Sequence, residues 1–172
     1  MTLFDQVLAL LNAHGVPHAL IGAAALAAHG VARSTYDIDL LTTDARVLGR
    51  GLWTALDHGG ATVDIRRGDA EDPLAGVIRI ETTGDRPVDI ILGKHGWQTR
   101  AVERADHGPD GAPVVRSRDL ILLKLYAGGT QDLWDVRELL QLPGRDRLVA
   151  EVEADLDEHS DAMRGLWVDA QR

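Results

Sequence analysis

The chain has 172 residues, 45% of them hydrophobic, and a net charge of −9 at pH 7. This length predicts one domain with a proper core. The acidic charge argues against a protein that coats nucleic acid non-specifically, although it leaves a tRNA or nucleotide substrate open. The absence of cysteine excludes a disulfide framework and thiolate zinc ligation. No apolar run approaches the roughly 18 residues of a membrane span, and no basic segment opens the chain, so we expect a cytoplasmic protein without membrane contact.

The first third of the chain predicts a helix, a strand, a second helix and a second strand. Apolar residues recur at helical spacing over 3–13, and Gly15 and Pro17 end that helix. A short strand over 18–21 leads to Gly22, which turns the chain into an Ala-rich helix over 23–29. The first N–H groups of that helix have no partner inside it and can face a phosphate. A strand over 37–42 follows.

The middle of the chain predicts a small mixed sheet. Asp44 is placed to cap a helix that runs to about Leu56. Three runs rich in β-formers follow at 61–66, 77–82 and 88–92, separated by turn-prone residues. A short helix is expected over 97–104, a surface turn over 108–113 and an edge strand at 114–115.

The last third of the chain predicts helices. Ser117 is expected to cap a helix that ends near 127–129, a second helix runs over 131–140, and a last one begins at Arg145. The expected fold class is therefore α+β, with a small mixed sheet flanked by helices. We expect residues 1–115 to form the core and residues 116–172 to form a helical segment packed on it.

Three carboxylates form the pattern most indicative of chemistry. Asp37 and Asp39 are two apart on a strand, so both side chains project to the same face, while Ile38 faces the other way. Two adjacent carboxylates repel each other. Their placement side by side is more readily understood if a cation lies between them. Asp89, on a later strand, would complete the site. Hard oxygen ligands of this kind suit Mg²⁺, which takes carboxylates, waters and substrate phosphates.

The residues around these carboxylates resemble a known family. The segment from Leu20 to Leu41 combines Gly22-Ala23, an Ala-rich helix and Arg33-Ser34-Thr35-Tyr36-Asp37-Ile38-Asp39, and Pro87-Val88-Asp89-Ile90-Ile91 follows later. It resembles the signature of the nucleotidyltransferase superfamily, the polymerase-β-like fold, and within it the AbiEii-like branch. Asp119 to Ala127 and Gln131 to Val136 are similar to that branch's later helical segment. The resemblance spans roughly residues 5 to 142.

This resemblance implies a fold and an activity. A polymerase-β-like fold would use two Mg²⁺ ions, or Mn²⁺, held by Asp37, Asp39 and Asp89. Asp89 would also lower the pKa of the attacking hydroxyl or accept its proton. Gly22 and Ala23 would present N–H groups to the phosphates of a nucleoside triphosphate. Further nucleotide contacts are expected from Arg33, Thr35 and Lys124.

Several of these residues also have simpler interpretations. Arg33 is as well suited to a structural ion pair with an aspartate, Thr35 to a β-branched strand position, and Lys124 to a solvated helix face. Asp132 and Asp135 are interpreted as residues that cap and solubilise their helix. The sequence also departs from the family, with Ala23 in place of a usual Gly or Ser and Gln131 in place of a usual Lys. The added methyl group of Ala23 is expected to narrow the space for a triphosphate.

The expected reaction is transfer of a nucleoside monophosphate from a triphosphate to an acceptor hydroxyl. Resemblance to the AbiEii-like branch favours tRNA or protein as the acceptor, a role in a toxin–antitoxin or phage-defence system, and a cognate toxin or antitoxin as partner. One alternative is a small-molecule acceptor, as in antibiotic-modifying nucleotidyltransferases. Another is a catalytically degenerate member that acts as a binding partner or antitoxin.

Overall fold

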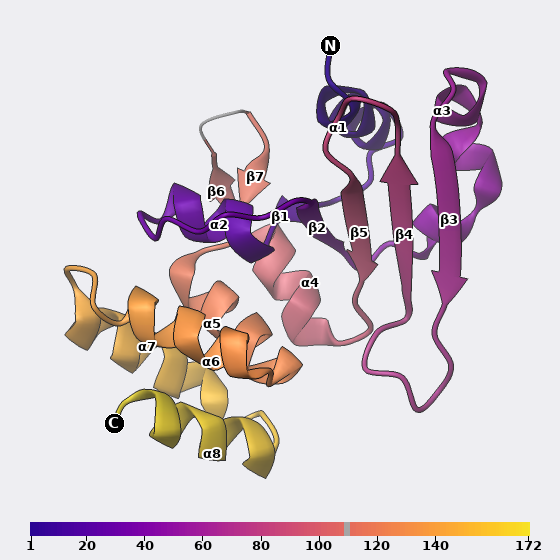
Figure 1. The fold of residues 1–172 in the computed structure, drawn as a ribbon. Helices are drawn as coiled ribbons and strands as arrows, with labels where there is room; N and C mark the ends of the chain where they lie inside the picture. The colour runs from indigo at the N-terminus through magenta and orange to yellow at the C-terminus, as the bar shows by residue number, and fades with distance from the viewer. Residues whose placement is uncertain (109–110) are drawn as a thin grey trace.

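The computed structural model describes residues 1–108 and 111–172. Its centre is a seven-stranded mixed sheet in the order β3-β4-β5-β2-β1-β7-β6 (Figure 1). The strands of the described chain are β1 (Ala19–Leu20), β2 (Ile38–Thr42), β3 (Thr62–Arg67), β4 (Gly76–Glu81), β5 (Val88–Leu92), β6 (Asp106–His107) and β7 (Pro113–Val114). The predicted α+β class with a mixed sheet is therefore confirmed.

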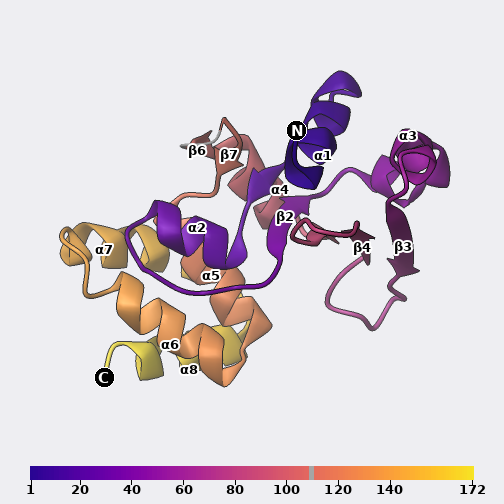
Figure 2. The ribbon, with the colours of Figure 1, turned by 45° about the horizontal axis from the view of Figure 1, so that its top comes forward.

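Helices precede, interrupt and follow the strands. The α-helices are α1 (Leu3–Ala13), α2 (Gly22–Ala28), α3 (Thr54–His58), α4 (Gly96–Glu103), α5 (Ser117–Ala127), α6 (Thr130–Leu139), α7 (Arg145–Leu156) and α8 (Asp161–Ala170). Two 3₁₀ helices, η1 (Ala45–Leu48) and η2 (Arg50–Trp53), lie before α3. The helices α5 to α8 pack against one another at one end of the sheet, and α2 contacts both β2 and α5 (Figures 1 and 2).

The pairing of three strands fixes which residues share a face. β2 runs parallel to β5, and this register sets Asp39 opposite Asp89. β4 runs antiparallel to β5 and sets Arg79 opposite the same Asp89. Paired residues project to the same side of a sheet. Arg79, Asp89 and Asp39 therefore form one row across three adjacent strands.

The opposite alternation builds the core. Ile78 and Ile80 on β4 and Val88 and Ile90 on β5 are fully buried, as is Leu40 on β2. They belong to one continuous apolar cluster that also contains residues of α1, α2, α5 and α6. The rigid centre of the molecule thus lies directly behind the row of charged residues.

The single helix predicted from Asp44 to about Leu56 is wrong, because the chain forms shorter helical segments there. Asp44 does cap, since its side chain accepts a hydrogen bond from the backbone N–H of Arg46, but the segment breaks into η1, η2 and α3. Gly49 adopts extended backbone angles between the two 3₁₀ helices. Glycine has a low helix propensity, and the indole N–H of buried Trp53 donates to the carbonyl of Val47, which holds the chain in this tighter path.

Three further expectations about the second half need correction. The N-cap of α5 is Arg116, and Ser117 is already the first helical residue. The helix expected from Arg145 onward is two helices, because the chain leaves helical geometry after Leu156 and Ser160 caps α8. The strand at 113–114 is not an edge strand, because β6 pairs along its outer side.

Two expectations concern loops and membranes. The predicted turn over 108–113 includes Pro109 and Asp110, which lie outside the described residues. On either side of them the N–H of Gly108 donates to the carbonyl of Ala112. Among the described residues no helix has both the length and the apolar character that a membrane crossing requires.

Candidate functional site

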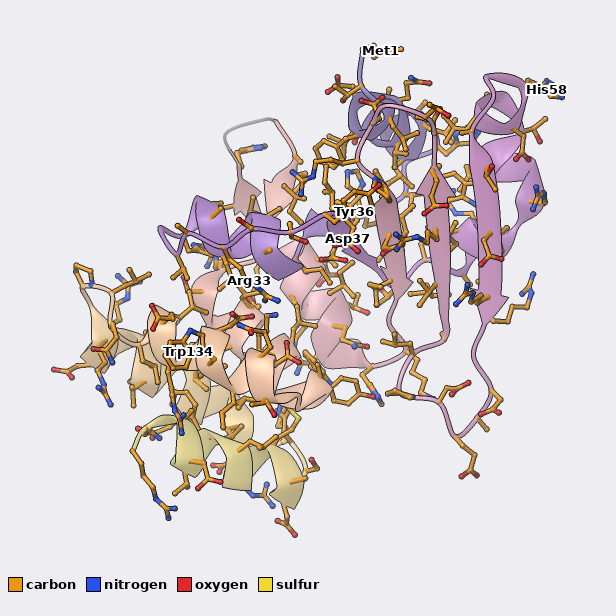
Figure 3. All side chains as sticks on the ribbon, viewed as in Figure 1. Met1, Arg33, Tyr36, Asp37, His58 and Trp134 are labelled. Atoms are coloured by element: carbon orange, nitrogen blue, oxygen red, sulfur yellow. The ribbon has the colours of Figure 1, made fainter. Side chains whose placement is uncertain are left out.

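The three aspartates of the sequence pattern lie on one face of the sheet. Asp39 and Asp89 are direct neighbours on the parallel strands β2 and β5. Asp37 lies immediately before β2, two residues from Asp39, and so projects to the same side. Figure 3 labels Asp37 and the adjoining Tyr36 between the sheet and α2. The fold therefore places these carboxylates side by side from segments fifty residues apart.

The turn into α2 packs directly on this row. Gly22 has a φ of +62°, a left-handed conformation that favours glycine. A Cβ atom at this position would lie 2.1 Å from Oδ2 of Asp39. The backbone N–H of Ile21 donates to the carbonyl oxygen of Asp39. The main chain at the start of α2 is thus held against the Asp39 carboxylate, and only glycine permits this approach.

Asp39 is the most electrostatically strained of the three carboxylates. Burial, followed by the charges of Asp37 and Asp89, raises its pKa to about 6. Lys124 and Arg33 oppose this shift from a distance. Within residues 1–108 and 111–172 no basic side chain forms an ion pair with Asp39. A half-buried carboxylate in this state is stabilised by a cation that binds beside it.

Asp89 is buried, and only one of its two carboxylate oxygens accepts a hydrogen bond in the described chain. Its Oδ2 accepts a hydrogen bond from Nη1 of Arg79 at 2.7 Å. Its Oδ1 is buried and has no hydrogen-bond partner in the described chain. Burial raises the pKa of Asp89 although Arg79 lowers it. A buried polar atom without a partner is uncommon in a folded protein.

Asp37 is oriented by its neighbours. Thr35 donates from Oγ1 to Oδ1 of Asp37 at 2.8 Å, and this bond, with help from Arg79, lowers the pKa of Asp37. The guanidinium of Arg86, from the β4–β5 turn, donates to the backbone carbonyls of Tyr36 and Asp37. The ionised form of Asp37 and the path of the chain before β2 are therefore both stabilised.

Arg33 and Lys124 meet on a different aspartate. Arg33 forms an ion pair with Asp135, and Lys124 lies 2.8 Å from the same Asp135 and 2.9 Å from Asp132. Gln131 adds a hydrogen bond from Nε2 to Oδ1 of Asp135. Figure 3 shows Arg33 between α2 and the C-terminal helices. This network ties the loop before β2 to α5 and α6.

Two of the simpler interpretations are wrong in the light of this network. The side chain of Lys124 is only 10% exposed, so it is not a solvated helix residue. Asp135 is 2% exposed, so it does not solubilise α6. Asp132 does cap its helix, because it accepts from the backbone N–H of Gly129. Arg33 takes the structural ion-pair role that the sequence allowed.

The two departures from the family motif have structural counterparts. Ala23 is buried, so its methyl group occupies protein interior and takes no space on the solvent side where a ligand would approach. The expectation that this methyl narrows a triphosphate site is therefore not supported. Gln131, in place of a lysine, donates to an aspartate that already pairs with two cations.

The donor set fits a hard divalent cation, although it is not preassembled. In the part of the chain that the structure describes, no group of three or more His, Cys, Asp or Glu side chains is placed to hold a metal ion. The orphaned Oδ1 of Asp89, the unpaired carboxylate of Asp39 and the close approach of Gly22 nevertheless provide the oxygen donors that Mg²⁺ prefers.

Comparison with solved structures identifies the fold. The structure of antibiotic-resistance factor ANT(2″)-Ia in solution matches with a TM-score of 0.55 at 17% sequence identity, over 90% of both chains. The crystal structure of ANT(2″)-Ia in complex with adenylyl-2″-tobramycin matches with a TM-score of 0.57 at 19% identity, over 92% of this chain and 97% of that one. The chain has the polymerase-β-like nucleotidyltransferase fold.

Sequence comparison adds no closer relative to this assignment. No protein-family model matches the chain. No curated protein matches it either. At the identities of the two structural matches, the likeness establishes the nucleotidyltransferase fold and leaves the AbiEii-like branch without structural support.

Two arginines at the site were not singled out from the sequence. Arg79 contacts two of the three carboxylates, and Arg86 holds the backbone before β2. A signal for Arg79 was present, since Arg79 and Asp89 lie at equal distances in sequence from Gly84, and a hairpin centred there pairs them. No comparable signal points to Arg86, whose contact spans fifty residues.

A separate cavity lies away from the carboxylates. It has a volume of about 740 Å³ and is lined by residues of the β7–α5 connection, α6 and α7, and by none of the candidate site residues. Its three arginines are already paired, Arg116 with Asp106, Arg118 with Asp155 and Arg147 with Glu151. The cavity therefore offers little uncompensated charge to a ligand.

Proposed function

We propose that this chain is a metal-dependent nucleotidyltransferase that transfers a nucleoside monophosphate from a nucleoside triphosphate to a hydroxyl group of a small-molecule acceptor. The observation that carries the proposal is the row of Asp39 and Asp89 with Asp37 beside it, against which the glycine turn of α2 is packed. Nucleotidyl transfer requires charge neutralisation beside a turn whose backbone can approach phosphates. The fold supports this reading, since both structural matches are of a nucleotidyltransferase-fold protein.

Each carboxylate has a proposed role. Asp37, Asp39 and Asp89 would hold one or two Mg²⁺ ions, with Mn²⁺ as a substitute. Bound Mg²⁺ would neutralise charge on the leaving pyrophosphate and lower the pKa of the attacking hydroxyl. Thr35 would keep Asp37 in the ionised orientation that a cation requires, through its hydrogen bond to Oδ1.

Asp89 is the proposed proton acceptor. Its Oδ1 is free of hydrogen bonds in the described chain, and burial raises its pKa toward the range in which a carboxylate accepts a proton effectively. The proton of the acceptor hydroxyl would move to the Asp89 carboxylate as the hydroxyl attacks the α-phosphorus. The bond from that phosphorus to the leaving pyrophosphate would break in the same step.

The remaining residues are proposed to bind the triphosphate. Gly22 and Ala23 would offer backbone N–H groups, in a turn that already lies against Asp39. Arg33 and Lys124 share the charge of Asp135, and their field reaches Asp39. We propose that this field, on the α5–α6 side, attracts the phosphates of the nucleotide.

The acceptor class is the finer part of the proposal. A small molecule is favoured over tRNA or protein because one of the structural matches is a complex with adenylyl-2″-tobramycin, a nucleotidylated antibiotic. The net charge of −9 also suits a cationic acceptor better than a polyanion. The motif resemblance to the AbiEii-like branch keeps an RNA or protein acceptor as an outcome of the test.

The test is nucleotide binding and turnover by the purified protein and by Asp39→Ala. Each of the four ribonucleoside triphosphates is offered with Mg²⁺ or Mn²⁺, and pyrophosphate release is followed with an aminoglycoside, with bulk tRNA and with neither. Release that requires metal, Asp39 and the aminoglycoside supports the proposal as stated. Release that requires tRNA instead corrects the acceptor. Absence of triphosphate binding in both metals would contradict the enzyme and leave a binding role for the fold.

A further inference from the structure

Arg79 contacts two of the three carboxylates that would hold a metal ion. Its Nη1 lies 2.7 Å from Oδ2 of Asp89 and 3.6 Å from Oδ2 of Asp37. It reaches them from β4, where it is the direct cross-strand partner of Asp89. A cross-strand neighbour in a hydrogen-bonded sheet stays within reach of its partner. The position of the guanidinium is therefore fixed by the sheet rather than by a mobile loop.

The charge balance shows what this guanidinium does. Asp37, Asp39 and Asp89 are three acids on one face, and Arg79 is the basic side chain that forms ion pairs with any of them in the described chain. One positive charge neutralises part of this cluster and leaves Asp39 unpaired. Arg79 therefore reduces the repulsion among the three carboxylates, but the cluster keeps a net negative charge.

Arg79 also has a second partner, which is not one of the three carboxylates of the row. Its Nε donates to Oε1 of Glu81 at 2.8 Å, and the Glu81 side chain is half exposed. An arginine side chain can rotate while it keeps one charged partner, because its donors point in several directions. A guanidinium that leaves Asp37 and Asp89 therefore remains paired with Glu81 and does not become an isolated charge.

A divalent cation and this guanidinium exclude each other. Both are positive, both would bind the carboxylates of Asp89 and Asp37, and repulsion between like charges at such short range is strong.

We propose that Arg79 is an internal counter-ion that holds Asp37 and Asp89 until a divalent cation displaces it toward Glu81, and that it thereby sets the metal affinity of the site. The inference rests on the proposed function, because the cation concerned is that of the proposed nucleotidyltransferase. Arg79 is a positioning residue in this scheme, since it acts through the carboxylates. As a consequence of this competition, the site binds a divalent cation only at higher metal concentration or together with a nucleotide.

The test measures Mn²⁺ binding without nucleotide, from the electron paramagnetic resonance signal of free Mn²⁺. Arg79→Gln is expected to lower the dissociation constant about tenfold or more, since one contacting positive charge is removed. The matched control is Arg66→Gln, which changes the net charge equally on the adjacent strand but pairs with Asp64. It is expected to change the constant less than about threefold, because Arg66 is exposed, contacts none of the three carboxylates and acts on Asp89 only through a screened field. Arg79→Lys, which keeps the charge, is expected to stay near the wild type.

The outcomes separate this inference from the proposed function. Equal effects of Arg79→Gln and Arg66→Gln overturn the role of Arg79, while loss of Mn²⁺ binding in Asp39→Asn would still support the metal site. Absence of Mn²⁺ binding in every protein, Arg79→Gln included, overturns both. A second measurement follows the wild type during a metal titration. The side-chain Nε–H resonance of Arg79, identified by its loss in Arg79→Lys, must shift during a Mg²⁺ titration, and a resonance unchanged at saturation overturns the displacement.

Discussion

A half-buried carboxylate that no cation contacts and that lies beside two other acids favours its protonated form, and Asp39 is such a group. Its pKa is raised to about 6 by burial and by Asp37 and Asp89, against 3.8 for an ordinary aspartate. Because the folded state holds the proton more tightly than the unfolded chain, stability is lost as the pH rises between these values. The penalty is complete above about pH 6 and absent below about pH 4.

Asp39→Asn is therefore expected to stabilise the metal-free protein at neutral pH. The gain in the free energy of unfolding at pH 7.5 is up to about 3 kcal/mol, from the size of the pKa difference. It should shrink at pH 5 and vanish near pH 4. Urea unfolding in EDTA at these three pH values measures it, with the half-exposed Asp64→Asn as a control that should change little. A gain that persists at pH 4 would show that packing, and not charge, is responsible.

Gly22 is expected to tolerate no side chain. Gly22→Ala places a methyl group 2.1 Å from Oδ2 of Asp39 at a φ of +62°. Gly15→Ala is the matched control, with a φ of +59° and no neighbouring atom within 4 Å. The control should cost about 1 kcal/mol from backbone strain alone, and Gly22→Ala about 2–4 kcal/mol with loss of triphosphate binding. Thermal and urea unfolding measure the difference, and equal losses would contradict the close approach.

At the scale of elements, the ion-pair network between α5 and α6 anchors the C-terminal helices to the site. Lys124→Met removes a buried cation from Asp132 and Asp135, although Arg33 still pairs with Asp135. Removing one partner of a buried pair destabilises strongly, and we expect a loss of about 2–4 kcal/mol.

The control for Lys124→Met is Arg147→Met, which breaks an exposed pair with Glu151 one turn away on α7. Exposed pairs of this kind contribute less than about 1 kcal/mol. Chemical unfolding followed by far-ultraviolet circular dichroism compares the two variants. Similar small losses in both would mean that the network near Asp135 is not needed to hold α5 and α6.

The elements predicted from hydrophobic periodicity are those whose buried face is marked by the local sequence. The strands β2, β4 and β5 and the helices α1 and α6 begin and end within about one residue of the expectation, since alternation or helical spacing marks the buried face. The segment after Asp44 failed because glycine spacing and the Trp53 hydrogen bond, rather than apolar spacing, decide its path. The two-residue strands β6 and β7 exist only through pairing with β1 and with each other.

At the scale of the whole molecule, the candidate site lies where the sheet, α2 and the C-terminal helices meet. Arg33 joins the loop before β2 to α6, and α2 contacts both β2 and α5. A ligand bound there is expected to stabilise the protein as a unit. The division of the chain at residue 115 into a core and a helical segment stays a prediction.

Mg²⁺ with a bound triphosphate is therefore expected to raise the melting temperature. Binding to the folded state alone adds about 2.7 kcal/mol when the ligand is at one hundred times its dissociation constant. Differential scanning fluorimetry with Mg²⁺ and nucleotide together, and with each alone, measures the shift. Asp89→Ala should lose it, while the exposed Arg66→Gln should keep it. A shift retained in Asp89→Ala would place the nucleotide elsewhere.

The sequence by itself determined the three carboxylates and the glycine before α2, because alternation in a strand and a turn residue with a special conformation are local properties. It also determined the α+β class. Only the tertiary structure decided what surrounds those residues. The pairing of Arg79 with Asp89 and Asp37, the burial of Lys124 with Asp135 and the unpaired oxygen of Asp89 arise between segments that are distant in sequence, and no local pattern fixes which charges meet or how deeply they are buried.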